Sequence, residues 1–438
     1  MAILSEAEAK NIIKKVLSYA KADETSVTIV GERTGNIRYA RNTVSTSGEK
    51  TDLSFVVTTV FGRRSGTASG NEFSEEAIKK VVKAAEDTAA LAPENPEWIS
   101  ALGPQQYQPS RTYIENTAAV TADARAQAAL QSIQPCAANN LVAAGYLEDS
   151  TVVVAIGNSK GLFGYNKTTD VNFSVTVRTK DDKGSGVASQ DTRDISALNT
   201  KTATAIAMQK AVASVNAIEM PPGKYTVILE PLGLAGFIPF FIGAMDARNA
   251  DEGRSFFSKK GGGTKVGDKL FSEELHIFSD ALHPQLPGAP FVEDGRAAER
   301  VDWVEKGVIK NLYYSRYWAD KKGVKAIPAS QAIIMKGGTQ SLQDMIKGSD
   351  KTILITTTHY MRLVDPQTIM ITGLTRDGLF YIENGVIKNA VKNFRFNESP
   401  INMFSNLLML GTPVRVGNSL IPPIKVANFN FTSISDAV

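Results

Sequence analysis

The stretch Pro221 to Ser258, PPGKYTVILEPLGLAGFIPFFIGAMDARNADEGRSFFS, places a strand, an apolar helix and a charged turn in immediate succession. Residues 224–230 follow a Pro-Pro-Gly breaker and are rich in β-branched and aromatic side chains, which predicts a buried strand. Residues 232–245 are almost wholly apolar and predict a helix. Because a helix that is apolar on all sides must be buried, we expect this segment at the centre of a core.

The composition is that of an ordinary folded protein with two or three domains. Of the 438 residues 43% are hydrophobic, and 48 Lys and Arg stand against 45 Asp and Glu, a net charge of +3. No basic block indicates nucleic-acid binding. The longest apolar segment is shorter than the ~20 residues that cross a bilayer, so no membrane span is expected. A single cysteine and a start without signal-peptide features predict a cytoplasmic protein.

The pattern of elements predicts an α+β fold, divided near residue 218. Residues 1–218 are expected to form an N-terminal α/β domain with an antiparallel sheet and packed helices. There a capping box at Ser5 begins a helix over residues 5–22, Ser74 caps a second helix, and short strands in an antiparallel meander are separated by glycines at 31, 35, 48 and 62.

Residues 219–438 are expected to form a C-terminal β-rich domain. Asn384-Gly385 predicts a hairpin with a type I′ turn. Ser399, Pro400 and Gly411 bracket residues 401–410, which predicts a helix with its usual cap residues.

Three further segments carry a resemblance to a known family. They are RYARNTVSTSGEK (residues 38–50), EDGRAAERVDWVEKGVIKNLYYSRYWA (293–319) and TGLTRDGLFYIENGVIK (372–388). Together with residues 221–258, and in this order, they resemble the TldD/PmbA family, whose members are also called modulators of DNA gyrase. The resemblance implies an N-terminal α/β domain, a C-terminal β-rich domain, and two-subunit assembly around a cleft that admits an unfolded peptide.

The zinc site of the family is replaced in this sequence. TldD-type members are zinc metallopeptidases with His-Glu-x-x-x-His on the central helix and a third ligand, a cysteine, near the C-terminus. When the family's trailing Ser-x-Phe-Ser is laid on residues 255–258, Ile238 and Gly243 stand at the histidine positions and Pro239 at that of the glutamate. Residues 408–426 contain no cysteine. Zinc needs imidazole, thiolate or carboxylate ligands, so we expect no metal in this chain and zinc only in a TldD-type partner.

Five charged residues are candidates for a peptide cleft. Asp246, Arg248 and Arg254 follow the apolar segment and adjoin a Gly-rich loop at residues 261–267, while Arg376 and Asp377 precede the final hairpin. The first three could bind peptide termini, or could form a solvated charged turn. The last two could line the cleft or pair with each other across a turn.

Two other patterns do not predict catalytic sites. The three histidines, His276, His283 and His359, lack the spacing of a ligand pair and are expected to be structural or solvated. The pentapeptide Gly157-Asn-Ser159-Lys-Gly161 matches a nucleophile elbow, but a β-prone sequence follows it where a helix is required, so a hairpin turn is predicted.

We therefore expect a PmbA/TldE-like subunit of a TldD-type metallopeptidase, without catalytic residues of its own. It would bind peptide and pair with a TldD-type partner or form a homodimer. One alternative is a hydrolase that uses a noncanonical metal site or Ser159, and another is a stand-alone peptide-binding protein. The strands at residues 379–383 and 429–433 are apolar and lightly charged, so we expect them in a subunit interface unless they are interior to their own sheet.

Overall fold

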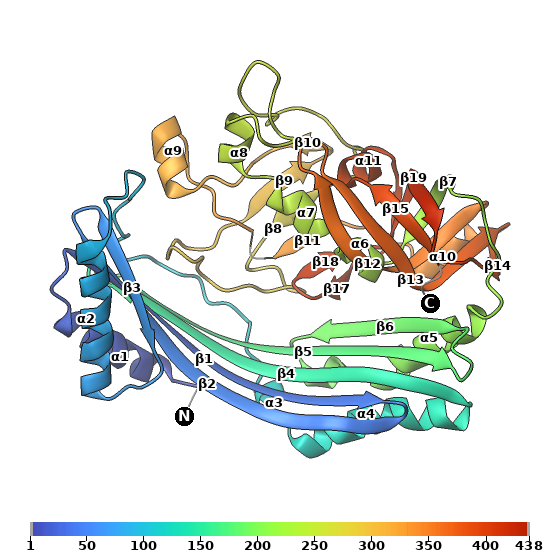
Figure 1. Ribbon diagram of the computed structural model, residues 1–438, viewed down its shortest axis with the longest axis horizontal. Coiled ribbons are helices and arrows are strands. Elements are labelled where there is room, and N and C mark those ends of the chain that lie inside the picture. Colours follow the sequence, from blue (N-terminus) through green and yellow to red (C-terminus); the bar gives the residue numbers. More distant parts are fainter. Residues whose placement is uncertain (1–2, 331, 436–438) are drawn as a thin grey trace.

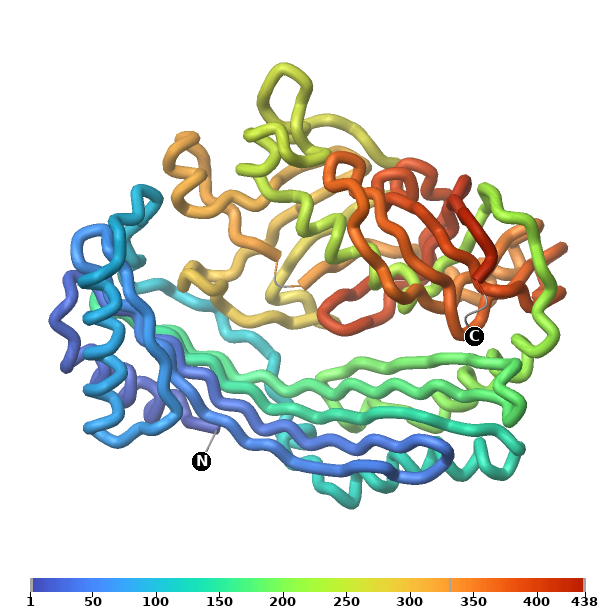
Figure 2. The backbone as a smooth tube through the Cα atoms, in the orientation of Figure 1, coloured from blue at the N-terminus to red at the C-terminus, as the bar shows by residue number. Residues whose placement is uncertain are grey.

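The computed structural model describes residues 3–330 and 332–435, in which a long curved sheet lies beside a more compact body (Figure 1). The long sheet comes from the first half of the chain, and the body, residues 223–434, comes from the second half. Near residues 214–222 the chain passes from the sheet to the body (Figure 2).

The long sheet has six antiparallel strands in the order β3-β2-β1-β4-β5-β6. Their bounds are β1 Glu24–Ala40, β2 Thr43–Phe61, β3 Arg64–Gly70, β4 Leu141–Asn158, β5 Phe163–Thr179 and β6 Ser185–Thr192. The antiparallel meander is confirmed, but the expected breaks at Gly31, Gly35 and Gly48 are wrong, because these glycines lie inside continuous strands. Steric packing requires a glycine at position 35, because a Cβ there would overlap the guanidinium of Arg125. Residues 43–54 of β2 pair only with β1, because β3 reaches only residues 55–61.

Helices cover one face of the long sheet. They are α1 Glu6–Tyr19, α2 Glu75–Leu91, α4 Ala122–Ala138 and α5 Thr200–Ala213; the short α3 Glu115–Ala118 and the 3-10 turn Ile195–Ala197 lie in connections. Side chains alternate along a strand, so Ile29 under α1 and α2 and Ile37 under α4 and α5 point to the same face. The predicted caps at Ser5 and Ser74 are confirmed. The opposite face meets the body, where Ile156 packs against Phe291.

The body contains two mixed sheets. One has the order β10-β9-β8-β11-β18-β17, and the other has the order β12-β7-β19-β15-β13-β14. In the second sheet β12 also pairs with β13, so β12, β7, β19, β15 and β13 form a closed ring. The bounds are β7 Gly223–Leu229, β8 Ile277–Ser279, β9 Val301–Glu305, β10 Val308–Ile309, β11 Ile333–Met335, β12 Thr352–Asp365, β13 Met370–Glu383, β14 Val386–Ala390, β15 Phe394–Glu398, β16 Leu407–Leu410, β17 Val414–Val416, β18 Ser419–Ile421 and β19 Ile424–Ile434, with α9 Arg316–Lys322, α10 Leu342–Lys347 and α11 Pro400–Ser405. The α+β fold class is thus confirmed, with the β-rich part at the C-terminal side.

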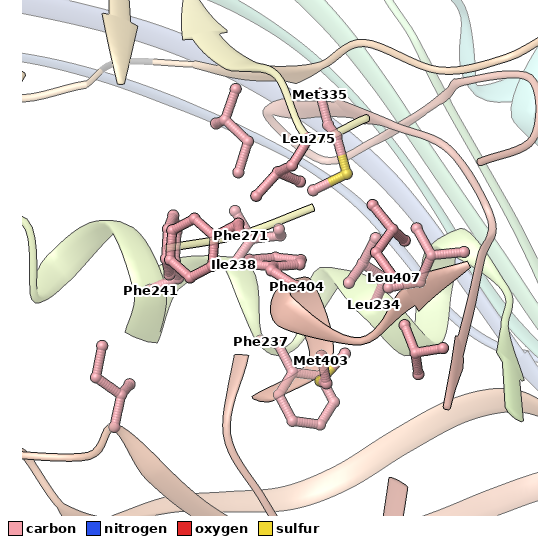
Figure 3. Close-up of a cluster of buried hydrophobic side chains, with 14 of the residues drawn as sticks. Leu234, Phe237, Ile238, Phe241, Phe271, Leu275, Met335, Met403, Phe404 and Leu407 are labelled. Carbon is pink, nitrogen blue, oxygen red and sulfur yellow. The ribbon is translucent and has the colours of Figure 1, made fainter. Parts of the chain in front are cut away.

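The apolar stretch forms two short helices instead of the single one expected over residues 232–245. After β7 come α6 Pro231–Ala235, α7 Ile238–Gly243 and α8 Ala247–Asp251. The break falls at Gly236, where a Cβ would overlap the sulfur of Met361, and Pro239 is the second residue of the next helix, where proline is tolerated. The predicted burial is confirmed for one side of the segment, where Phe237 and Phe241 are fully buried in the largest core cluster of the described residues (Figure 3), but it is wrong for Pro239 and Gly243, which are exposed.

Three other expectations of the second half can be compared with the structure. The Asn384-Gly385 hairpin is confirmed, with φ of 51° and 76° between β13 and β14. The helix expected over residues 401–410 ends at Ser405, because residues 407–410 pair with β19 as β16. The strands at residues 379–383 and 429–433 lie inside the ring, between neighbours on both sides, so they are not exposed edges. No helix in residues 3–330 or 332–435 has the length and apolar character of a membrane span.

Candidate functional site

The two ends of α7, which the family resemblance places at metal-ligand positions, differ in how far they are exposed to solvent. The side chain of Ile238 is 3% exposed and lies among Phe241, Phe271 and Phe404 (Figure 3). Pro239 and Gly243 are exposed and line a cavity of about 250 Å³. Apart from the adjacent backbone of α7, no atom lies within 4 Å of the place where a Cβ on Gly243 would stand. The open end of α7 is therefore a surface that a ligand can reach.

Three segments that are distant in sequence form the walls of this cavity, which we call the α7 cavity. They are α7 itself, the turn after α8, and the hairpin that joins β12 to β13. The lining residues are Pro239, Phe240, Gly243, Ala244, Asn249, Arg254, Ser255, Leu363, Pro366 and Ile369. The hairpin is held to the α8 turn by a hydrogen bond that the side-chain amide of Gln367 donates to the carbonyl of Gly253, at 3.2 Å.

The hairpin wall carries backbone strain. Tyr360 and Ile369 both have positive φ, 53° and 52°, which is rare for a large side chain and rarer for a β-branched one. Ile369 is 1% exposed and lines the cavity. Strain of this kind persists where the surroundings enforce it, and it gathers at functional sites. The sequence search missed this wall, for which the Asp365-Pro366 turn was the only local signal.

Of the five predicted cleft residues, only Arg254 lines the α7 cavity. Its guanidinium pairs with Glu252 and its side chain is 60% exposed. Asp246 caps α8 by accepting a hydrogen bond from the backbone N–H of Asn249 at 2.6 Å. Arg248 makes two hydrogen bonds of 2.8 Å to Glu97, in the connection after α2. Asp246 and Arg248 thus have partners within the fold, and Arg248 remains 40% exposed, so whether either residue binds peptide stays a prediction.

Arg376 and Asp377 lie at a different place, where β13 meets β6. Asp377 is 5% exposed with φ of 53°, and its carboxylate accepts a hydrogen bond of 2.5 Å from the Ser185 hydroxyl. Its other oxygen is 3.7 Å from Nε2 of His359. Asp377 borders a second cavity, of about 370 Å³, between the long sheet and the body. The predicted set therefore divides between two places and does not form one site.

The histidines occupy separate surroundings. His276 lies 2.9 Å from Asp302, and His283 packs edge-on against Phe278. Burial lowers the pKa of His359, an effect that Arg376 adds to and Asp377 opposes. Within residues 3–330 and 332–435 no group of three or more His, Cys, Asp or Glu side chains could hold a metal ion.

The nucleophile-elbow pentapeptide is a hairpin turn, as predicted, between β4 and β5. The hydroxyl of Ser159 accepts a hydrogen bond from the backbone N–H of Thr25 at 3.1 Å. This hydroxyl therefore serves the fold.

Comparison with known proteins accounts for most of the chain. Residues 26–89, 113–215 and 222–433 match the family descriptions PmbA/TldA metallopeptidase domain 1, central domain and C-terminal domain. The chain belongs to the PmbA/TldD family. A relative named metalloprotease, from Archaeoglobus fulgidus, is 32% identical over 111 residues, which is 25% of this chain and 25% of that protein.

Three solved structures share the fold of this PmbA/TldD family member. TldE from Thermococcus kodakarensis has a TM-score of 0.87 at 17% identity, covering 97% of this chain and 99% of its own. Putative modulators of DNA gyrase from Thermotoga maritima and Bacteroides thetaiotaomicron have TM-scores of 0.86 and 0.85 at 16% and 18% identity, and cover 97% and 99% of this chain and 100% of their own chains. At these identities the likeness concerns the fold.

Proposed function

We propose that this PmbA/TldD family member is a TldE-like subunit that contributes peptide-binding surface to a cytoplasmic metallopeptidase whose zinc is held by a TldD-type partner. The proposal rests on the residues that occupy the two ends of α7 and on their exposure to solvent. One position that aligns with a metal-ligating histidine is a core isoleucine, and the other is a glycine beside an open cavity.

The residues present do not fit a catalytic zinc site. Such a site needs three protein ligands and usually a base for the metal-bound water. Ile238 and Gly243 offer no donor atom, and Pro239 offers neither a carboxylate nor a backbone N–H. Metal-dependent hydrolysis is therefore assigned to the partner, and the role left for this chain is to bind and orient the peptide.

Assembly with a TldD-type partner, or with a second copy, belongs to the same proposal. The strands at residues 379–383 and 429–433 no longer support it, because they are paired on both sides. Apolar side chains at the β12–β13 hairpin do support an interface near the α7 cavity: Tyr360, Leu363 and Val364 are 67%, 46% and 59% exposed. Clustered exposed apolar side chains are typical of interaction sites.

The test is to purify this chain alone and together with a TldD-type chain that carries His-Glu-x-x-x-His. After dialysis against a chelator, the single chain should hold no stoichiometric zinc and should not cleave unfolded casein. The pair should bind zinc and cleave, and Glu→Gln in the partner's motif should abolish cleavage. Ser159→Ala in this chain is the matched control and should leave the activity of the pair unchanged.

Two results would favour the alternatives. Cleavage by the single chain that is lost on chelation, or on Ser159→Ala, would make it a hydrolase in its own right. Failure to associate with any TldD-type chain, combined with tight peptide binding, would make it a stand-alone peptide-binding protein.

A further inference from the structure

The α7 cavity combines apolar walls with a single charged group. Among the described residues that line it, Pro239, Phe240, Ala244, Leu363, Pro366 and Ile369 are apolar, and only Arg254 carries a charge. Two polar groups of the lining are already committed to the fold. The Ser255 hydroxyl donates to the carbonyl of Ala244 at 2.9 Å, and the backbone N–H of Arg254 donates to the carbonyl of Asn249 at 2.8 Å. The guanidinium of Arg254 is therefore the strongest hydrogen-bond donor among the described lining residues.

The pairing of Arg254 leaves it free to exchange partners. Within residues 3–330 and 332–435 its ion pair is with Glu252, an exposed neighbour that also pairs with Arg248 at 3.1 Å. Exposed ion pairs of this kind are weak. If Arg254 leaves Glu252 to bind a ligand, Glu252 still has its ion pair with Arg248. A guanidinium offers two parallel N–H groups in the geometry that a carboxylate accepts. A carboxylate is therefore a ligand group that complements Arg254.

The volume of the cavity and the absence of a side chain at Gly243 limit which ligand group can lie next to that carboxylate. At about 250 Å³ it is smaller than the ~300–1,000 Å³ typical of drug-sized ligand sites. It therefore suits a side chain or two better than a cofactor. Apart from the adjacent backbone of α7, no atom lies within 4 Å of the absent Cβ of Gly243, so a peptide backbone can approach α7 closely. The buried side chain of Ile369 and the ring of Phe240 favour an apolar occupant.

We propose that the α7 cavity binds the C-terminal residue of a peptide, with its apolar side chain in the cavity and its α-carboxylate on Arg254. This inference rests on the proposed function, since it names the part of the peptide that this subunit holds. An acidic side chain next to an apolar one offers the same chemistry from inside a chain. The difference matters, because a grip on the free C-terminus would set the distance between that end and the bond cleaved in the partner.

The direct test measures binding of short fluorescein-labelled peptides to the single chain by anisotropy. Three peptides share the same labelled N-terminal part: one ends in Leu with a free carboxylate, one ends in Leu amide, and one ends in Glu-Leu amide. The free acid should bind at least ~10-fold more tightly than the Leu amide, because the amide lacks the charged carboxylate that accepts hydrogen bonds from Arg254. Equal binding of the free acid and the Glu-Leu amide would overturn the assignment to the C-terminus.

Variants locate the site. Arg254→Gln should reduce the preference for the free acid to about one, and Arg254→Lys should restore only part of it, because an ammonium cannot form the paired hydrogen bonds. Gly243→Leu should weaken all three peptides by projecting a side chain into the cavity, because a Cβ at this position meets no neighbouring atom. Arg64→Gln on β3, outside the cavity, is the matched control and should behave as the wild type.

The outcomes separate this inference from the proposed function. If the free acid and the Leu amide bind equally, or if Arg254→Gln keeps the preference, the carboxylate site is wrong while a zinc-free subunit role stands. If the single chain cleaves the peptides, the subunit role is wrong whatever Arg254 does. If no peptide binds to the single chain or to its complex with a TldD-type chain, the α7 cavity is not a peptide site.

Discussion

Histidine substitutions at Ile238 and Gly243, the positions that the family resemblance aligns with metal ligands, should differ in their effect on stability. Ile238→His removes a buried aliphatic side chain, which costs about 1.5–3 kcal/mol, and leaves an imidazole nitrogen without a hydrogen bond, which costs ~1–3 kcal/mol more. The expected loss of about 2.5–6 kcal/mol is a large part of the ~5–15 kcal/mol that stabilises a typical protein. Gly243→His adds a side chain in open space and replaces a poor helix former, so the change should stay within about 1 kcal/mol.

Urea unfolding followed by tryptophan fluorescence measures both effects. Trp303 and Trp318 belong to the same core cluster as Ile238, so their emission reports on that core. Ile238→Val, which removes one methyl group, should cost only about 0.5–1.5 kcal/mol and calibrates the site. The reasoning is refuted if Ile238→His unfolds at the wild-type urea concentration, or if Gly243→His is the more destabilised of the two.

Three further predictions concern buried ionisable groups. Asp149→Asn should destabilise the long sheet by about 3 kcal/mol in urea unfolding, because Arg125 loses its 2.8 Å ion partner while 2% exposed. Burial raises the pKa of Cys136 to about 11, so iodoacetamide at pH 8 should label it only after unfolding. Burial also raises the pKa of Glu398 above its unfolded value of 4.5, so its contribution to stability is present below pH 4.5 and is lost as pH rises through the raised pKa. The stability of Glu398→Gln relative to wild type should therefore improve from pH 4.5 to pH 7.

Simple controls decide these three predictions. The exposed pair of Lys83 and Asp87 supplies the reference for Asp149→Asn, since Lys83→Ala should cost no more than about 0.5 kcal/mol. A similar cost at both sites would contradict the buried-pair argument. Rapid labelling of native Cys136, or a constant difference between Glu398→Gln and wild type at every pH, would contradict the other two.

Local signals predicted the elements whose chemistry is contained in a few neighbouring residues. The caps at Ser5 and Ser74 and the Asn384-Gly385 turn are of this kind, because each satisfies its own backbone groups. The break at Gly236 is different, since it depends on Met361, which a distant segment supplies. Residues 407–410 have the composition of a helix end, yet pairing with β19 makes them a strand. Long-range contacts overrode local preference in both cases.

The candidate site was less predictable than the fold. Sequence reasoning found Arg254, but it grouped this residue with Asp377, which borders another cavity. It also missed Leu363 and Ile369, because a cavity wall formed by a remote hairpin leaves no pattern near α7. The family resemblance directed attention to α7, while only the structure revealed that its two ends differ in exposure.

The unpaired part of β2 has a consequence for solubility during synthesis and storage. Residues 43–54 offer a row of free backbone N–H and C=O groups on the side away from β1, and such a row can template the addition of strands from other molecules. The stretch has no proline or bulky aromatic residue to obstruct a neighbour, and its charges are confined to Glu49, Lys50 and Asp52. Charged side chains on an edge strand oppose such pairing, so we expect high salt, which screens these charges, to favour association of this edge with other molecules.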